Sequence, residues 1–322
     1  MVSLIITVLN EKNNLADWLD GILSQTVLPE EIIIVDGGSK DGTWEMLLEK
    51  NKSNSLIKVR QYPGNISVGR NFAISQAKGE IIVATDAGCT YDIGWFKKII
   101  EPILSGKSSF AATGFGPWFK PDDGLLPRLI AAATIPAPAE FRRNWLPSSR
   151  SVAFKKEIWQ QAGGYPEWIP LCEDVIFDFK IFKLGVKPEY IREPLVFWRP
   201  RTTLKTYFKQ LFGYTRSDGH GKLWFHRQMI RYISYSVNII LLYLIFQVSW
   251  WFVLILFAGM FDYMRRFWLR WLIFSAQLSL ADKISGFVFL PLVVAWGDLA
   301  KMCGWPLGVY ERRAGKIIYH NI

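Results

Sequence analysis

The sequence is poor in the residues that build disulfide frameworks and zinc sites. Its 322 residues include only three cysteines, Cys89, Cys172 and Cys303, and only three histidines. Cysteines this few and this widely spaced exclude a disulfide framework and a zinc site, and they indicate a reducing compartment. A basic leader with a cleavage site is also lacking, so we expect no signal peptide.

Acidic residues are also fewer than basic residues. The net charge is +10, half of the residues are hydrophobic, and 15 are tryptophan. A surplus of positive charge favours an anionic partner such as a membrane surface or a nucleotide. We do not expect nucleic acid as a partner, because the chain has neither an RNA-binding signature nor a lysine- and arginine-rich tail.

Strands and helices alternate over the first hundred residues. Apolar runs rich in β-branched residues predict strands at 2–9, 32–35, 57–61 and 81–84, and apolar residues at helical spacing lie between them. This order predicts parallel βαβ units and therefore an α/β, doubly wound, mainly parallel sheet. Ligands of such sheets bind beyond the carboxyl ends of the strands.

Polar residues follow three of these predicted strands. Asn10 and Glu11 follow the first strand, Asp36 the second and Asp86 the fourth. Any one of them could be a turn cap. Acidic side chains at neighbouring strand ends repel one another unless a cation, or the hydrogen-bond donors of a nucleotide base, compensate their charge. We therefore interpret the set as a ligand site. Gly88 would let a ligand approach the backbone closely.

Two acids open a helix near the middle of the chain. A predicted strand and a helix ended by Gly163 and Gly164 precede Glu173 and Asp174, which begin a helix with an apolar face. Acids at a helix N-terminus can serve only the helix dipole. The same helix end would also hold Asp174 ionised and ready to accept a proton.

Together these motifs resemble the catalytic domain of the family-2 glycosyltransferases, which have the GT-A fold. The resemblance covers about residues 2–220 and is carried by SLIITVLNEKNNLADWLDGILSQT, EEIIIVDGGSKDGT and GRNFAISQAKGEIIVATDAG. It implies that a UDP- or GDP-sugar is the donor and that Asp174, beside Glu173, is the catalytic base. It further implies that Thr7, Leu9 and Glu11, at the end of the first strand, contact the nucleoside. Asp36, at the end of the second strand, would hold the base or the ribose.

The sequence departs from that family at its metal motif. The family has Asp-x-Asp, whereas this chain has Asp86-Ala87-Gly88. Only Asp86 can be carried over as a ligand of Mg²⁺ or Mn²⁺, which needs few protein carboxylates when phosphates and water complete its shell. Arg70 has two interpretations, a diphosphate contact or a surface residue at a helix start. Gln210 and Arg216 are further diphosphate candidates, although the family's Gln-x-x-Arg-Trp motif is absent.

Hydrophobic segments follow a basic and aromatic stretch. Residues 237–260 carry no charge and are long enough to span a bilayer, although a re-entrant hairpin is an alternative. A second candidate span, 284–305, is interrupted by Asp298 and Lys301. Residues 264–274 are typical of an amphipathic helix in the membrane plane, and the basic stretch before residue 232 suits anionic lipid.

We therefore expect a GT-A catalytic domain over residues 1–225 and a C-terminal α-helical, membrane-associated region over 226–322. The nucleotide-sugar half would cover about 1–115 and the acceptor half about 116–225. The expected reaction is an inverting sugar transfer to a lipid carrier, lipid-linked saccharide or glycolipid, in polysaccharide or glycolipid biosynthesis. We expect the catalytic domain on the cytoplasmic face of the cell membrane. The alternative is an inactive, sugar-nucleotide-binding membrane scaffold on the same fold.

Overall fold

The computed structural model describes residues 1–141 and 145–316, and the chain divides into two compact units. The first unit holds the described residues of 1–118 and 136–199, and the second holds those of 119–135 and 200–316. This division by packing differs from the expected boundary near residue 225, which stays a prediction.

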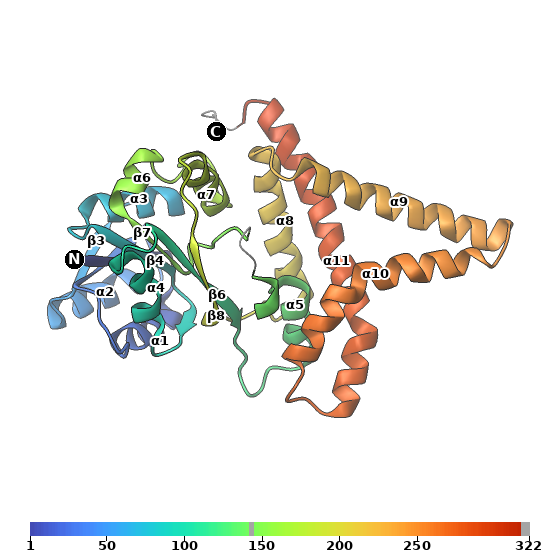
Figure 1. The fold of residues 1–322 in the computed structure, drawn as a ribbon, viewed down its shortest axis with the longest axis horizontal. Helices are drawn as coiled ribbons and strands as arrows, with labels where there is room; N and C mark the ends of the chain where they lie inside the picture. Colours follow the sequence, from blue (N-terminus) through green and yellow to red (C-terminus); the bar gives the residue numbers. More distant parts are fainter. Residues whose placement is uncertain (142–144, 317–322) are drawn as a thin grey trace. The chain divides into compact units, whose positions relative to one another are not determined.

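The first unit is built on one eight-stranded sheet with the order β3-β2-β1-β4-β7-β6-β8-β5 (Figure 1). The strands β3, β2, β1 and β4 are mutually parallel, and β6 is parallel to β8, whereas β7 and β5 are antiparallel to their neighbours. The predicted doubly wound, mainly parallel sheet is thus confirmed. The strands are β1 (Val2–Val8), β2 (Glu31–Asp36), β3 (Ile57–Gln61), β4 (Ile81–Asp86), β5 (Cys89–Tyr91), β6 (Phe110–Pro117), β7 (Val152–Lys155) and β8 (Glu189–Trp198).

Helices pack on the sheet through apolar side chains. One core cluster joins alternate residues of the strands, such as Ile5 and Ile33, to Ala73 and Phe177 of two helices. The alternation follows from the two-residue period of a strand, which sends every second side chain to the same face. The helices of this unit are α1 (Lys12–Leu23), α2 (Thr43–Ser53), α3 (Ile66–Gln76), α4 (Trp95–Leu104), α6 (Lys156–Gln161) and α7 (Glu173–Lys183), with a 3₁₀ turn, η1 (Pro138–Glu140).

Strand register brings the predicted polar strand ends together. Thr7 of β1 lies opposite Asp86 of β4, and Val8 lies opposite Asp36 of β2. Helix α3 packs against β1 at the same level, because Gly69 has no side chain to keep them apart. A Cβ at Gly69 would lie 2.7 Å from Cγ2 of Thr7. The next residue of α3 is therefore held beside the end of β4.

The second unit is helical: α5 (Leu125–Thr134), α8 (Leu204–His220), α9 (Phe225–Gln247), α10 (Phe252–Phe274) and α11 (Leu280–Arg313). Helices α8 and α11 approach closely because glycines lie between them. A Cβ at Gly304 would lie 2.4 Å from the carbonyl oxygen of Phe212, and one at Gly308 would lie 1.9 Å from that of Arg216. Small residues at a helix crossing allow this contact between backbones.

The expected span over residues 237–260 is not one continuous helix. Helix α9 ends at Gln247, and α10 begins at Phe252 and runs in the opposite direction (Figure 1). Within the break, residues 248–251, the backbone N–H of Ser249 donates to the carbonyl oxygen of Leu244. Residues 264–274 are the second half of α10, and 284–305 lie within α11. By length and composition, α9 and α11 could each cross a membrane.

Candidate active site

Arg70 is a buried arginine on α3 that bonds two carboxylates. Its Nη1 donates to Oε1 of Glu173 at 2.5 Å, and its Nη2 donates to Oδ1 of Asp86 at 2.6 Å. The side chain is only 2% exposed, so the interpretation of Arg70 as a surface residue is wrong. Although burial lowers the pKa of Arg70, the two carboxylates outweigh burial and raise it. A charged Arg70 therefore ties the end of β4 to the start of α7.

The two acids at the start of α7 have different surroundings. Glu173 is buried and bonded to Arg70. Burial raises the pKa of Glu173, and the Arg70 guanidinium opposes the rise. Asp174 is half-buried, and its Oδ1 accepts from the backbone N–H of Val175 at 2.9 Å. Of the two predicted catalytic residues, Asp174 is thus the more accessible, while Glu173 holds Arg70.

The segment that leads into α7, residues 163–172, is tightly packed and fixes the position of Glu173 and Asp174. The ring of Tyr165 lies 5.3 Å from the Arg70 guanidinium carbon and stacks on Phe177 at a centroid distance of 4.0 Å. Cys172, immediately before Glu173, has the left-handed φ of +61°. That conformation costs a non-glycine residue about 1–2 kcal/mol, so the surrounding packing must impose it.

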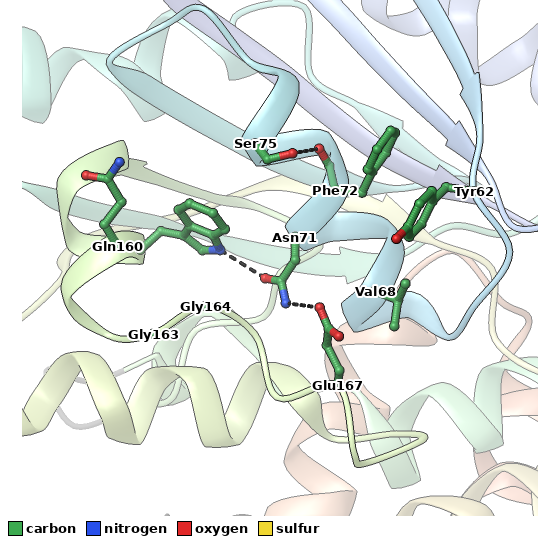
Figure 2. A pocket seen from close by; sticks show the side chains of 10 residues that line it. Tyr62, Val68, Asn71, Phe72, Ser75, Gln160, Gly163, Gly164 and Glu167 are labelled. Atoms are coloured by element: carbon green, nitrogen blue, oxygen red, sulfur yellow. Dashed lines mark hydrogen bonds between the residues drawn. The ribbon is translucent and has the colours of Figure 1, made fainter.

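Asn71 fixes the other end of this turn. Its Oδ1 accepts from the indole N–H of Trp159 and the backbone N–H of Tyr165, and its Nδ2 donates to the carbonyl of Tyr165 and to Glu167. Figure 2 shows the bond from Asn71 to Glu167, with Gly163 and Gly164 on the neighbouring turn. The sequence predicted only a C-cap at these glycines.

A cavity of about 530 Å³ lies beside Asn71 (Figure 2). Asn71 and the indole of Trp159, two of its polar groups, bond to each other at 2.9 Å. The cavity thus adjoins the hydrogen bonds that hold the turn. It is lined by Tyr62, Val68, Asn71, Phe72, Ser75, Trp159, Gln160, Gly163, Gly164 and Glu167.

The residues predicted to contact the nucleoside differ in exposure. Leu9 is 54% exposed, and Thr7 and Glu11 are half-buried. Oε2 of Glu11 accepts from the side chain of Asn14 at 2.8 Å. The strand end of β1 thus offers one open apolar side chain and one carboxylate.

Asp36 is fully buried. Its carboxylate accepts from the backbone N–H groups of Gly38 and Ser39, from the hydroxyl of Ser39 and from Nε2 of Gln61. This is the turn-capping arrangement that Asp forms at a strand end. Its role toward a nucleoside stays a prediction.

Asp86 faces a second arginine that the sequence did not single out. The Nε of Arg150 lies 3.6 Å from Oδ2 of Asp86, and its guanidinium carbon lies 4.7 Å from the ring of Trp198. Arg150 precedes β7, which pairs with β4 in antiparallel fashion. In the sequence, Arg150 is recognisable only as a charged residue just before a predicted strand. The pairing of β7 with β4 is what reveals its position beside Asp86.

The donor set does not fit a divalent ion held by the protein. Asp86 supplies one carboxylate, and both of its oxygens face guanidinium groups. Gly88 stands where the motif has its second Asp, with φ at +83°. Within residues 1–141 and 145–316, no three His, Cys, Asp or Glu side chains come together as a metal site. Divalent ions of this kind require oxygen ligands.

Gln210 and Arg216 lie on α8, in the second unit. The Nε2 of Gln210 donates to the hydroxyl of Tyr214 at 3.1 Å. Arg216 makes a bidentate ion pair with Glu311 of α11, at 2.7 and 2.6 Å. Both side chains thus serve contacts inside their own unit, and their roles toward a diphosphate stay predictions.

Comparisons with known proteins agree with this geometry. Residues 3–147 match the model of glycosyl transferase family 2. The succinoglycan biosynthesis protein ExoA of Rhizobium meliloti is 25% identical over 231 residues, 66% of this chain and 67% of that protein. The O-antigen chain rhamnosyltransferase RfbN of Salmonella typhimurium is 22% identical over 229 residues, 64% and 70% of the two chains.

A shorter similarity links the chain to a third enzyme. WfaP of Escherichia coli, a UDP-Glc:alpha-D-GlcNAc-diphosphoundecaprenol beta-1,3-glucosyltransferase, is 35% identical over 88 residues, 27% of this chain and 35% of that protein.

The family match covers the part of the sheet that carries the polar strand ends. Residues 3–147 include β1 to β6, and with them Thr7, Asp36, Arg70 and Asp86. The sheet around these residues has the mainly parallel GT-A arrangement. The part of the chain that the family model matches, residues 3–147, is therefore similar to glycosyl transferase family 2, and its mainly parallel sheet is of the GT-A type.

Proposed function

We propose that the protein is an inverting glycosyltransferase whose general base is Asp174. The observation that carries the proposal is the position of Asp174 in the first turn of α7, beside the buried Glu173–Arg70–Asp86 chain. A helix N-terminus stabilises a negative charge, so it favours the ionised carboxylate that a base needs. The family match over residues 3–147 supports the reaction class, and the buried Glu173–Arg70–Asp86 chain supports a fixed position for Asp174.

The proposed reaction is a single displacement. Asp174 accepts the proton of an acceptor hydroxyl, and that oxygen forms a bond to the anomeric carbon of the donor sugar. The bond from this carbon to the diphosphate oxygen breaks, and its electron pair stays on the leaving nucleoside diphosphate. One displacement by one nucleophile inverts the anomeric configuration. Glu173 would position Arg70 and leave the proton transfer to its neighbour.

The proposed donor is a UDP- or GDP-sugar at the carboxyl ends of β1, β2 and β4. Leu9 and Glu11 would contact the nucleoside, with Thr7 beneath them and Asp36 shaping the turn. This placement follows the rule that ligands of open α/β sheets bind beyond the carboxyl ends of the strands. The Mg²⁺ or Mn²⁺ expected at Asp86 stays a prediction; it would take most of its oxygen ligands from the diphosphate and water, because Asp86 supplies one carboxylate, and no step of the proposed reaction depends on it.

We propose that α9 and α10 attach the protein to a membrane as a hairpin. The tip of the hairpin exposes large apolar side chains, among them Phe246 at 81% and Trp250 and Trp251 at 59% and 60%. The part of α9 that follows its last charged residue, residues 232–247, would extend about 24 Å at 1.5 Å per residue. That length is less than the roughly 30 Å of a hydrocarbon core. A hairpin of that length enters from one face and returns to it.

Basic residues at the base of the hairpin support an anionic lipid as partner. The exposed Arg227 lies near the start of α9, and the exposed Arg265 and Arg266 lie on the second half of α10. Cationic side chains beside an apolar insert attract anionic headgroups.

We propose a membrane-borne acceptor on the cytoplasmic face, either a lipid carrier, a lipid-linked saccharide or a glycolipid. The acceptor in the name of WfaP, a sugar on diphosphoundecaprenol, is of the second kind. The setting would be polysaccharide or glycolipid biosynthesis.

One observation favours a second candidate, a sugar-nucleotide-binding scaffold without catalysis. Asp86 lacks the second Asp of the metal motif, and Arg70 already occupies one of its oxygens. Binding of a sugar nucleotide without turnover would be the outcome expected of a scaffold.

Donor turnover by the detergent-purified full chain distinguishes the two candidates. UDP- and GDP-sugars would be offered with a lipid extract as acceptor, with EDTA and with added Mg²⁺ or Mn²⁺. We expect one donor to be consumed and its sugar to appear in the lipid fraction, and we expect Asp174→Asn to abolish the transfer while retaining nucleotide binding. Tight binding of a sugar nucleotide without any transfer would favour the scaffold.

A further inference from the structure

Two arginines share the carboxylate at the end of β4. The side chain of Asp86 lies between two guanidinium groups, with Arg70 at 2.6 Å from Oδ1 and Arg150 at 3.6 Å from Oδ2. Arg70 is enclosed at 2% exposure, and its terminal nitrogens bond Asp86 and Glu173. Arg150 is 29% exposed. Of these two arginines, only Arg150 is accessible to a ligand.

The position of Arg150 is held by its surroundings. The hydroxyl of Thr85, the residue before Asp86, donates to the backbone carbonyl of Arg150 at 2.8 Å. The Nη1 of Arg150 donates to the hydroxyl of Ser148 at 3.1 Å, and the Arg150 guanidinium lies over the ring of Trp198. A guanidinium held in this way loses little conformational entropy when a ligand binds.

An anion at this strand end would suit Arg150. A planar guanidinium donates two parallel hydrogen bonds to phosphate oxygens, and such charge-assisted bonds are stronger than neutral ones. The pair with Asp86, at 3.6 Å, is longer than a charge-assisted hydrogen bond, so a phosphate can compete for the guanidinium. Asp86, in contrast, offers a divalent ion one carboxylate, both oxygens of which already face guanidinium groups.

We infer that Arg150 binds the diphosphate of the donor and neutralises its charge, in place of a metal ion held by a second Asp. The inference rests on the proposed function, because it takes the nucleoside diphosphate sugar as the ligand. When the bond between the anomeric carbon and the diphosphate oxygen breaks, the electron pair moves onto that oxygen. Arg150 donates hydrogen bonds to the diphosphate as this charge grows, while the acceptor proton goes to Asp174.

The test is calorimetric titration of the full chain in detergent with UDP, GDP and dTDP, each beside its nucleoside, in EDTA and then in Mg²⁺. Arg150→Gln removes the charge and keeps hydrogen-bond donors, and Arg150→Lys keeps the charge without the planar fork. Lys155→Ala is a matched control, since Lys155 is a half-exposed cation at the end of β7 that pairs with Glu157. Thermal unfolding of each variant reports whether it is folded.

We expect one nucleoside diphosphate to bind in EDTA, and Arg150→Gln to raise its Kd about 10- to 100-fold, the range for loss of hydrogen bonds to a charged group. Arg150→Lys should have an intermediate Kd, while Lys155→Ala and the binding of the nucleoside should be unchanged.

Binding that requires Mg²⁺, or an unchanged Kd in folded Arg150→Gln, would overturn the inference and leave the proposed function standing. If the wild-type chain bound no nucleoside diphosphate under either condition, the proposed function and the inference would fail together.

Discussion

Removal of the Arg70 side-chain charge tests the buried chain at the centre of the site. Arg70→Met keeps most of the side-chain volume but leaves Glu173 and Asp86 without their shared partner. Breaking a buried ion pair by deleting one member costs about 3–5 kcal/mol, because the other charge stays buried and uncompensated. Most of this cost should arise at Glu173, which is 8% exposed, since Asp86 is 23% exposed and partly hydrated.

A loss of this size is easily measured as a shift in melting temperature. At about 2–4 °C per kcal/mol for a unit of 150–250 residues, Arg70→Met should lower the Tm by about 6–20 °C. The double variant Arg70→Met with Glu173→Gln should recover part of the loss, because a neutral amide is cheaper to bury than an unpaired carboxylate.

The pH dependence of the same variant has a defined sign. Loss of Arg70 removes the largest influence that opposes burial, and burial raises the pKa of Glu173. The folded state then holds a proton that the unfolded chain releases, so the stability of the variant falls as pH rises. Scanning fluorimetry at pH 8 and pH 5 should therefore show a smaller Tm deficit at pH 5. A deficit under 2 °C at pH 8, or one that grows on acidification, would refute this reasoning.

Three further changes test other parts of the structure. Asn71→Ala should lower the free energy of unfolding by about 1–3 kcal/mol, because it leaves the buried N–H of Tyr165 unpaired; denaturant unfolding measures this, and sugar transfer should also slow as the turn before Asp174 loosens. Asp178→Asn should raise the Tm at pH 8 more than at pH 5, since burial raises the pKa of Asp178 and the wild-type fold loses stability as that group is forced to ionise. Replacing both Trp250 and Trp251 by Glu at the hairpin tip should reduce sedimentation with anionic vesicles while unfolding of the first unit stays unchanged.

A different result would contradict each of these three predictions. An Asn71→Ala protein as stable as Gln76→Ala, an exposed change on the same helix, would show that the hydrogen bonds to the turn are dispensable. Equal Tm gains for Asp178→Asn at both pH values would show that the Asp178 carboxyl does not titrate abnormally. Undiminished vesicle binding by the Trp250 and Trp251 variant would move the membrane contact away from the hairpin.

Much of the sheet could be predicted because its strands are long, apolar and buried. The run before Asp36 is apolar throughout, and only Thr85 separates the apolar run from Asp86, so the strand ends could be placed within a residue or two. Parallel connection then implied that these ends lie side by side, and the register of Thr7 with Asp86 bears this out. The acids at the start of α7 were marked by the helix that follows them.

The pairing inside the site could not be predicted. Arg70 and Glu173 are 103 residues apart, and their contact depends on how α3 and α7 pack on one face of the sheet. Strand β8 was missed because Arg192, Glu193 and Pro194 interrupt its apolar pattern and its register shifts beside Gly114. The break between α9 and α10 carries neither glycine, proline nor charge, so the apolar run resembled one helix.

The most direct test of the account compares two Asp→Asn changes on one helix. Asp174 is the proposed base at the start of α7, and Asp178 is a buried residue one turn later on the same helix. Initial rates of sugar transfer would be measured for both variants at saturating donor, together with the Kd of the nucleoside diphosphate. The account predicts that Asp174→Asn loses transfer by at least the roughly 10²-fold typical of a general base, while both variants keep nucleotide affinity and Asp178→Asn keeps its rate. Transfer by Asp174→Asn at the rate of Asp178→Asn would contradict the central claim.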